Sequence, residues 1–184
     1  MRLFIGIPLP SDYAQIIRKI QEAWKKRLVS QVSWVRPELA HVTFKFLGEV
    51  DEEKIPAIVQ AMREAARGSF EAQGGAGGFF PPRGGPRVVW VGLRQGREEC
   101  AEYFEKLDGG LAKAGFLAES KPFCPHLTVA RVKAAMRSDD WPGLLVDLKR
   151  DWPAFTVSHV VLWQSILKSS GPEYRRVAEV GLEK

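Results

Sequence analysis

The 184-residue sequence has few of the features on which several large protein classes depend. Its two cysteines, Cys100 and Cys124, are too few for a disulfide framework. No apolar run approaches the roughly 18 residues of a transmembrane helix, and the apolar stretch after Met1 is too short for a signal peptide. Runs of five or more like charges, which mark basic tails, are also missing. These absences lead us to expect a protein of the cytoplasm with no membrane segment.

The composition that is present is typical of a globular protein. Hydrophobic residues make up 45% and charged residues 27% of the chain. The length predicts one domain, or two small lobes that share a core. The formal net charge of +5 suits a ligand that carries phosphate, although many proteins without such a ligand share this small basic excess.

Histidine is scarce, and two of the three histidines stand in the same short pattern. Residues His41–Phe44 and His126–Val129 both read His-apolar-Thr-apolar, and the two histidines lie 85 residues apart. A single His-x-Thr in a strand is usually structural, but two copies in corresponding places favour a functional pair. His159 lacks the pattern, and we expect it to be structural.

The same offset relates other segments and predicts two half-repeats, about 1–85 and 86–170, followed by a C-terminal strand. Each half reads strand, helix, His-x-Thr strand, helix, strand, which predicts one bilobal domain over residues 1–184. The last helix of the second half is the weakest, because Trp141-Pro142-Gly143 interrupts it. The matched segments are Leu3–Ile5 with Val88–Trp90, Ser11–Ser30 with Gly96–Gly115, Asp51–Arg67 with Met136–Trp152, and Phe70–Ala72 with Phe155–Val157.

Two further segments lie outside this pattern. β-rich runs at 160–167 and 174–182 surround a turn at 168–172, which predicts a hairpin. Residues 73–87 are rich in glycine, proline and arginine, and they predict a loop or linker between the halves. This segment is neither a P-loop nor a dinucleotide fingerprint, and we assign no role to Gly74–Gly78.

Side chains two residues apart in a strand point to the same face, so His41 and Thr43 share a face, as do His126 and Thr128. Two such strands related by a pseudo-twofold would bring two imidazoles and two hydroxyls to one cleft. In-line displacement at phosphorus needs a base and an acid on opposite sides, and histidine serves as either near neutral pH. Metal ligands in zinc-enzyme spacing are missing from the sequence, and we expect no metal.

Two basic residues near the motifs are candidates for holding phosphate, with a solvated surface charge as the alternative for each. Lys45 follows His41 by four residues, so a regular strand would place it on the His/Thr face. Arg131 follows His126 by five residues, so a regular strand would turn it to the opposite face.

Together these residues resemble the two-histidine (2H) phosphoesterase superfamily, whose mark is a pair of His-x-Thr/Ser-x motifs. Within it, the sequence is similar to the bacterial and archaeal RNA 2′,3′-cyclic phosphodiesterases, also called 2′-5′ RNA ligases. The resemblance spans nearly the whole chain. It is carried by Arg2–Ile7, Trp34–Val50, Pro86–Leu93, Pro125–Arg131 and Gly171–Tyr174.

The resemblance implies an α/β (α+β) bilobal fold, with two antiparallel sheets facing a central cleft and helices outside. It implies hydrolysis of RNA 2′,3′-cyclic phosphate ends to 2′-phosphomonoesters without metal or cofactor. Separately, we expect the protein to be a monomer. His41 would then be the proton donor and His126 the proton acceptor, while Thr43, Thr128 and Arg131 would bind phosphate. Two alternatives stay open: ATP-independent 2′-5′ RNA ligation as the main activity, and a non-catalytic RNA-binding module.

Overall fold

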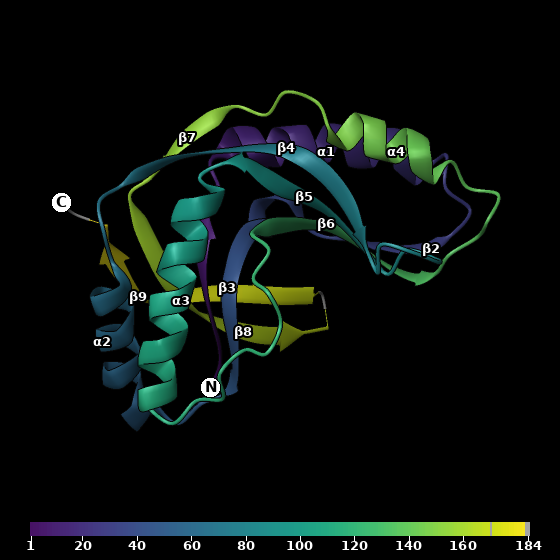
Figure 1. The fold of residues 1–184 in the computed structure, drawn as a ribbon. Helices are drawn as coiled ribbons and strands as arrows, with labels where there is room; N and C mark the ends of the chain where they lie inside the picture. The colour runs from purple at the N-terminus through teal and green to yellow at the C-terminus, as the bar shows by residue number, and fades with distance from the viewer. Residues whose placement is uncertain (170, 183–184) are drawn as a thin grey trace.

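The computed structural model describes residues 1–169 and 171–182 and shows a curled antiparallel sheet with helices on its outer side (Figure 1). The strands are β1 Arg2–Pro8, β2 Gln31–Trp34, β3 His41–Glu49, β4 Phe70–Phe80, β5 Val88–Gln95, β6 His126–Ala134, β7 Ala154–Val157, β8 His159–Lys168 and β9 Gly171–Gly181. The α-helices are α1 Ser11–Lys25, α2 Ile55–Ala65, α3 Arg97–Lys113 and α4 Trp141–Leu148, and two 3₁₀ turns cover Pro37–Leu39 and Glu52–Lys54.

The strand order is β7-β4-β5-β6-β3-β1-β8-β9, with β2 also paired to β6. The predicted mixed fold is confirmed, and β8 and β9 form the predicted hairpin. The two predicted sheets touch at one residue pair, Val42 with Leu127, which joins them into a single nine-stranded sheet. Val42 and Leu127 are 85 residues apart in the sequence, so the two halves meet at residues that correspond in the predicted repeat.

Two helices, α1 and α3, each pack over a different part of the sheet from the one that contains the strand before them in the chain. α1 follows β1 in the chain, yet it lies over β4–β6 beside α4, where the Trp24 indole donates to Asp147 (Figure 1). α3 follows β5, yet it lies beside α2 on the other side, where the Tyr103 hydroxyl donates to the Met62 carbonyl. The lobes in space therefore differ from the halves in sequence, and an origin by duplication stays a prediction.

The glycine-rich segment is largely a strand, so the prediction of a loop over residues 73–87 is wrong for its first part. Glycine weakens a strand because it offers no side chain to pack, but here large side chains from elsewhere fill the space. A Cβ on Gly78 would lie 2.1 Å from the Trp90 ring, and one on Gly74 would lie 3.0 Å from the Trp152 ring. The turn itself is confined to the residues between β4 and β5.

Trp141-Pro142-Gly143 begins α4 and does not interrupt a longer helix, which corrects the predicted helix over 136–152. The Asp140 carboxylate accepts a hydrogen bond from the Gly143 amide at 2.9 Å and caps the helix. Proline is tolerated in the first turn because its missing N–H would have no partner there.

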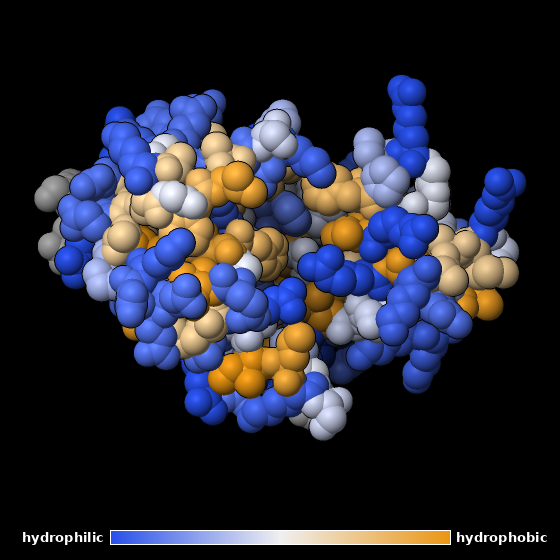
Figure 2. Space-filling view, turned by 90° about the horizontal axis from the view of Figure 1, so that it is seen from below, coloured by the Kyte–Doolittle hydropathy of each residue, from blue (hydrophilic) through white to orange (hydrophobic). Residues whose placement is uncertain are grey.

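The core lies between the sheet and the helices. Alternate residues of β1, namely Leu3, Ile5 and Ile7, are almost completely buried there, as are Val42 and Leu127. The opposite, concave face of the curled sheet is called the site face below. Viewed from below, the molecule is hollowed between its two sides, with apolar surface on both (Figure 2). Among residues 1–169 and 171–182, no helix is long and apolar enough to cross a membrane.

Candidate active site

The two His-x-Thr motifs meet where β3 pairs with β6. His41 and His126 are the first residues of these strands, and each lies one position from the Val42–Leu127 pair. Val42 and Leu127 point into the core, so the neighbouring histidines and threonines, which are all half-buried, lie on the site face. An antiparallel register extended by one residue on each side of this pair would set His41 opposite Thr128 and His126 opposite Thr43. The structure thus brings the four motif residues together.

Each imidazole is held by a backbone carbonyl. His41 Nδ1 lies 2.7 Å from the Leu39 carbonyl oxygen, and His126 Nδ1 lies 2.7 Å from the Cys124 carbonyl oxygen. A carbonyl only accepts hydrogen bonds, so Nδ1 carries the proton and donates. Nε2 is therefore the atom that gains or loses a proton. It can act as a base when the ring is neutral and as an acid when the ring is charged.

The surroundings lower the pKa of both histidines. Burial is the largest cause for each, and the hydrogen bond to the carbonyl opposes it. The positive charge of Arg131 lowers both pKa values further, and the charge of His126 also lowers the pKa of His41. The site thus disfavours positive charge until an anion binds.

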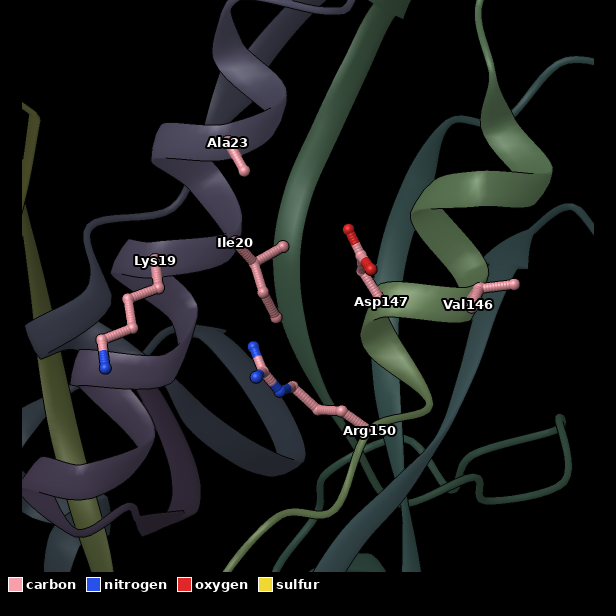
Figure 3. A pocket seen from close by; sticks show the side chains of 6 residues that line it. All are labelled: Lys19, Ile20, Ala23, Val146, Asp147 and Arg150. Carbon is pink, nitrogen blue, oxygen red and sulfur yellow. The ribbon is translucent and has the colours of Figure 1, made fainter.

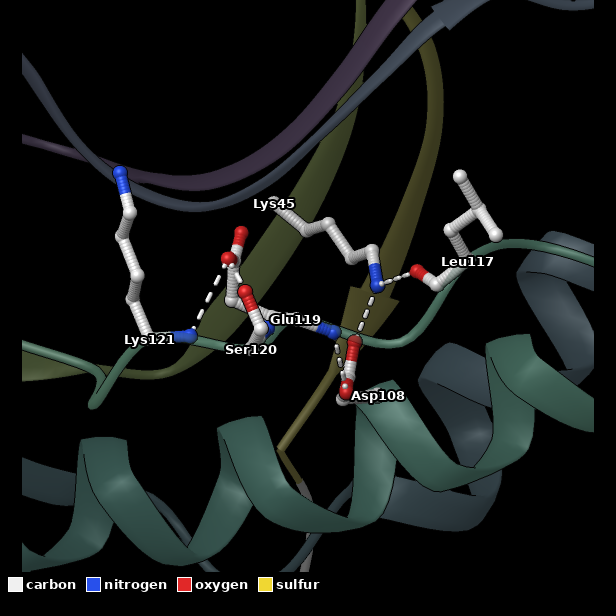
Figure 4. A network of polar contacts seen from close by, with 6 residues as sticks. All are labelled: Lys45, Asp108, Leu117, Glu119, Ser120 and Lys121. Atoms are coloured by element: carbon white, nitrogen blue, oxygen red, sulfur yellow. Dashed lines mark hydrogen bonds and ion pairs between the residues drawn. The ribbon is translucent and has the colours of Figure 1, made fainter.

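A β-bulge in β3 turns Lys45 away from the site, so the prediction that it shares the His/Thr face is wrong. Phe44 is the extra residue, because Ile5 pairs with Lys45 and the next residue of β1 skips to Thr43. Lys45 is only 8% exposed, and its ammonium forms an ion pair with Asp108 and donates to the Leu117 carbonyl at 2.6 Å (Figure 4). The bulge leaves Phe46 outside the core, 66% exposed.

A second bulge occupies the corresponding place in β6 and brings Arg131 to the site face. Val129 is the extra residue there, because Val89 pairs with Ala130 and Trp90 with Thr128. β6 is therefore not a regular strand at this point, and the condition under which Arg131 would face away from the site does not hold. Its charge acts on both histidines from this position.

Aromatic rings lie against both imidazoles. They explain part of the burial that lowers the pKa of each histidine, and burial also raises the pKa of the Tyr174 hydroxyl. The ring centres of Phe4 and Tyr174 lie 4.8 and 5.4 Å from His41, and those of Phe80 and Trp90 lie 5.2 and 6.0 Å from His126.

Two other kinds of site were considered: a metal site and a surface pocket. In the described part of the chain, no group of three or more His, Cys, Asp or Glu residues could hold a metal ion. A surface pocket lies between α1 and α4, where the Asp147 carboxylate already accepts from Trp24. Its lining contains no histidine and consists of Lys19, Ile20, Ala23, Val146, Asp147 and Arg150 (Figure 3).

A family model described as LigT-like phosphoesterase matches residues 7–90 and again residues 91–174. The chain belongs to the LigT-like phosphoesterase family. The two successive matches each contain one His-x-Thr motif.

Relatives of this LigT-like phosphoesterase include proteins named RNA 2′,3′-cyclic phosphodiesterase. The protein of Thermotoga maritima is 34% identical over 100% of this chain and 96% of its own length. That of Methanocaldococcus jannaschii is 32% identical over 97% of this chain and 99% of its own. A crystal structure from Thermus thermophilus is 28% identical with a TM-score of 0.80, covering 99% of this chain and 98% of that one. LigT of E. coli with 3′-AMP shares the fold, with 24% identity, a TM-score of 0.77 and coverage of 100% and 98%.

Sequence reasoning missed the aromatic residues of this LigT-like phosphoesterase site. Phe4 and Trp90 lie in corresponding strands, one beside each histidine, but they are 86 residues apart, so the repeat offset of 85 pairs Phe4 with Val89 and gave no signal for the aromatic pair. Tyr174 entered only as part of the resemblance. Phe80 carried no signal, because its segment predicts a loop. The His159 Nδ1 lies 3.1 Å from the neighbouring Ser158 hydroxyl, and a structural role for His159 stays a prediction.

Proposed function

We propose that the protein hydrolyses RNA 2′,3′-cyclic phosphate ends to 2′-phosphomonoesters by acid–base catalysis between two histidines, without a metal. The observation that carries this proposal is the pair of imidazoles on neighbouring strands, each with Nδ1 held by a carbonyl and Nε2 left for chemistry. The names of the relatives, RNA 2′,3′-cyclic phosphodiesterase, support the substrate class.

The proposed step is an in-line displacement. His126 Nε2 takes a proton from water as the water oxygen bonds to phosphorus, and the bond from phosphorus to the ribose 3′-oxygen breaks. His41 Nε2 gives its proton to that oxygen, which leaves the phosphate on the 2′-oxygen. Which histidine is acid and which is base follows the family resemblance, because the two motifs are nearly equivalent.

Phosphate binding falls to three further residues in this proposal. The hydroxyls of Thr43 and Thr128 donate to the non-bridging oxygens, and the Arg131 guanidinium offsets their charge. In the free protein, burial lowers the pKa of both histidines and the charge of Arg131 lowers it further. A bound phosphate raises these pKa values again, so one proton is retained by the pair when the substrate is present.

Two other functions can be tested with cyclic-phosphate substrates and the same histidine variants. An RNA 5′-hydroxyl can replace water as the nucleophile, which gives 2′-5′ ligation by the same residues. A non-catalytic RNA-binding module would bind cyclic-phosphate ends without turnover, and loss of either histidine would change nothing but affinity.

The deciding experiment measures hydrolysis of a 2′,3′-cyclic nucleotide in the presence of EDTA. His41→Ala and His126→Ala should each lose roughly 10²–10⁴ in rate, the usual value of a general acid or base. His159→Ala is the matched control and should retain activity. Strong inhibition by EDTA that zinc reverses would contradict the metal-free mechanism. Phosphorus NMR should show a 2′-phosphate, and a 3′-phosphate would exchange the acid and base assignments.

A further inference from the structure

The two carbonyl groups that hold the histidines are themselves held in different ways. The Leu39 carbonyl, which accepts from His41, belongs to a 3₁₀ turn that the Leu39 amide closes with a backbone hydrogen bond of 2.9 Å. The Cys124 carbonyl, which accepts from His126, lies in the irregular residues 117–124 shortly before β6. In the described ranges 1–169 and 171–182, these eight residues make no backbone–backbone hydrogen bond. The orientation of His126 therefore depends on side chains that fix this segment.

The chain around Cys124 leaves its carbonyl little freedom of its own. Residues 122–125 read Pro-Phe-Cys-Pro. A residue that precedes proline is restricted to extended conformations, so Cys124 cannot readily turn its carbonyl while Phe123 stays in place. The direction of the carbonyl therefore follows the position of Phe123.

The Phe123 ring is held by two buried rings from other elements. It stacks on Phe104 of α3, with ring centres 4.4 Å apart and planes at 8°. Phe44 of β3 lies on it at 5.6 Å with planes at 22°, and Phe44 also packs against Tyr103 at 4.7 Å. Phe104 and Phe44 are only 8% and 5% exposed. Close-packed side chains in a core keep to one arrangement, so these rings fix the Phe123 side chain and its backbone.

The β-bulge in β3 makes this contact possible. Phe44 is the extra residue of the bulge and directly follows Thr43 of the first motif. The next residue, Lys45, donates to the Leu117 carbonyl at 2.6 Å (Figure 4). Two consecutive residues of β3 thus hold the two ends of residues 117–124. The strand of the first motif supports the segment that carries the acceptor for the second histidine.

We propose that Phe123 is a positioning residue for His126. Its stack on the two buried rings holds the Cys124 carbonyl at His126 Nδ1, and this acceptor keeps the proton of the neutral imidazole on Nδ1. The consequence for catalysis rests on the proposed function, in which Nε2 must accept a proton from water. Without a fixed acceptor at Nδ1, the neutral ring is a mixture of two tautomers, and the fraction protonated at Nε2 cannot act as the base.

The test reads the His126 tautomer by ¹⁵N NMR of the imidazole nitrogens at about pH 8, above the ordinary histidine pKa of about 6.5. The wild-type protein should show a single tautomer with the proton on Nδ1, at signals that His126→Ala removes. Phe123→Ala should show both tautomers at His126 and leave the His41 signals unchanged, because the 3₁₀ turn still holds their acceptor. For a cyclic mononucleotide, kcat should fall roughly 10- to 100-fold, as expected for a misplaced catalytic group, with little change in KM.

Two variants separate positioning from a merely structural role. Phe123→Tyr keeps the stacked ring and should retain both the wild-type tautomer and the wild-type kcat. Phe155→Ala is the matched control for lost packing, because Phe155 of β7 is a half-buried phenylalanine, as Phe123 is, and packs against Tyr13 at 5.2 Å. It should leave the His126 tautomer unchanged, and a mixture of tautomers in this control would contradict a specific role for Phe123.

A mixture of tautomers at His126 in the wild-type protein, or an unchanged tautomer in folded Phe123→Ala, overturns the proposal. If circular dichroism shows that Phe123→Ala does not fold, Phe123→Leu replaces it, because leucine fills part of the volume without a flat ring. An unchanged tautomer in folded Phe123→Leu overturns the proposal as well. The NMR readout needs no substrate, so absence of hydrolysis by the wild-type protein overturns the proposed function and not the positioning of His126.

Discussion

Phe46 and Arg131 hold corresponding positions, five residues after His41 and His126, yet they have opposite character. Each follows a bulge that takes it out of the core. One side of the site therefore presents an exposed phenyl ring and the other a guanidinium. Because the motifs themselves are nearly symmetrical, such differences decide how a substrate is oriented between the two histidines.

Arg131→Gln should shift the pH dependence of the reaction. Both histidine pKa values are lowered, so the bell-shaped profile of kcat/KM for the wild-type protein should have its maximum below pH ~6.5, the ordinary pKa of histidine. Removing the Arg131 charge raises both pKa values and moves the maximum to higher pH. Kinetics on a cyclic mononucleotide from about pH 5 to 9 measure this shift.

Arg131→Lys keeps the charge and is the control for that shift, because it should hold the maximum near its wild-type pH. A profile that stays in place in Arg131→Gln would show that burial alone sets the histidine pKa values.

Thr43→Ala and Thr128→Ala should reduce turnover less than loss of a histidine does. Each removes one hydrogen bond to a charged phosphate, which contributes about 1.5–3 kcal/mol. Steady-state kinetics of both single variants and the double variant test this, and the double variant should be the slowest. Full activity in both single variants would assign the threonines to structure.

At the scale of helices and strands, the sequence predicted features that depend on neighbouring residues. It did not predict features that depend on the strand paired alongside. The shared face of His41 and Thr43 follows from strand alternation, which needs only neighbouring residues. The bulges at Phe44 and Val129 depend on the register with β1 and β5, which no short pattern encodes. The strand through Gly78 likewise depends on Trp90, which arrives from the next strand.

Lys45→Met should destabilise the protein without touching the site directly. Lys45 and Asp108 are 8% and 13% exposed, and removing one partner leaves the other charge buried and unpaired. Breaking a buried ion pair in this way costs about 3–5 kcal/mol. Urea unfolding measures the loss. The double variant Lys45→Met/Asp108→Asn should recover part of it, and equal stability of Lys45→Met and wild type would show that solvent reaches the pair.

Across the whole molecule, the resemblance predicted the fold and the family, while the crossing of α1 and α3 was not predicted. Periodicity indicates which face of a helix is apolar. It does not indicate which end of the sheet the helix covers, because the outer face of the sheet is apolar at both ends. The choice depends on contacts such as that of Trp24 with Asp147 in α4. The monomeric state and the cytoplasmic location stay predictions.

The net charge of +5 should give a shallow salt dependence. An oligonucleotide with a cyclic phosphate end contacts more cations than a cyclic mononucleotide, and binding to phosphates weakens as salt displaces the released counterions. We expect kcat/KM to fall with salt for the oligonucleotide and to change little for the mononucleotide. Equal values for both substrates at about 50 and about 500 mM salt would show that the basic residues serve solubility only.

The pairing of β1 with β8 also bears on how the protein is made. Leu3 pairs with Gln164, so β1 pairs with a strand that is translated about 160 residues later. During synthesis the ribosome releases β1 long before β8, and α1 emerges before the strands it will cover. Contacts so distant in sequence slow folding. The nascent chain therefore exposes one open edge of β1 until β8 has been translated, a period in which a chaperone would limit aggregation.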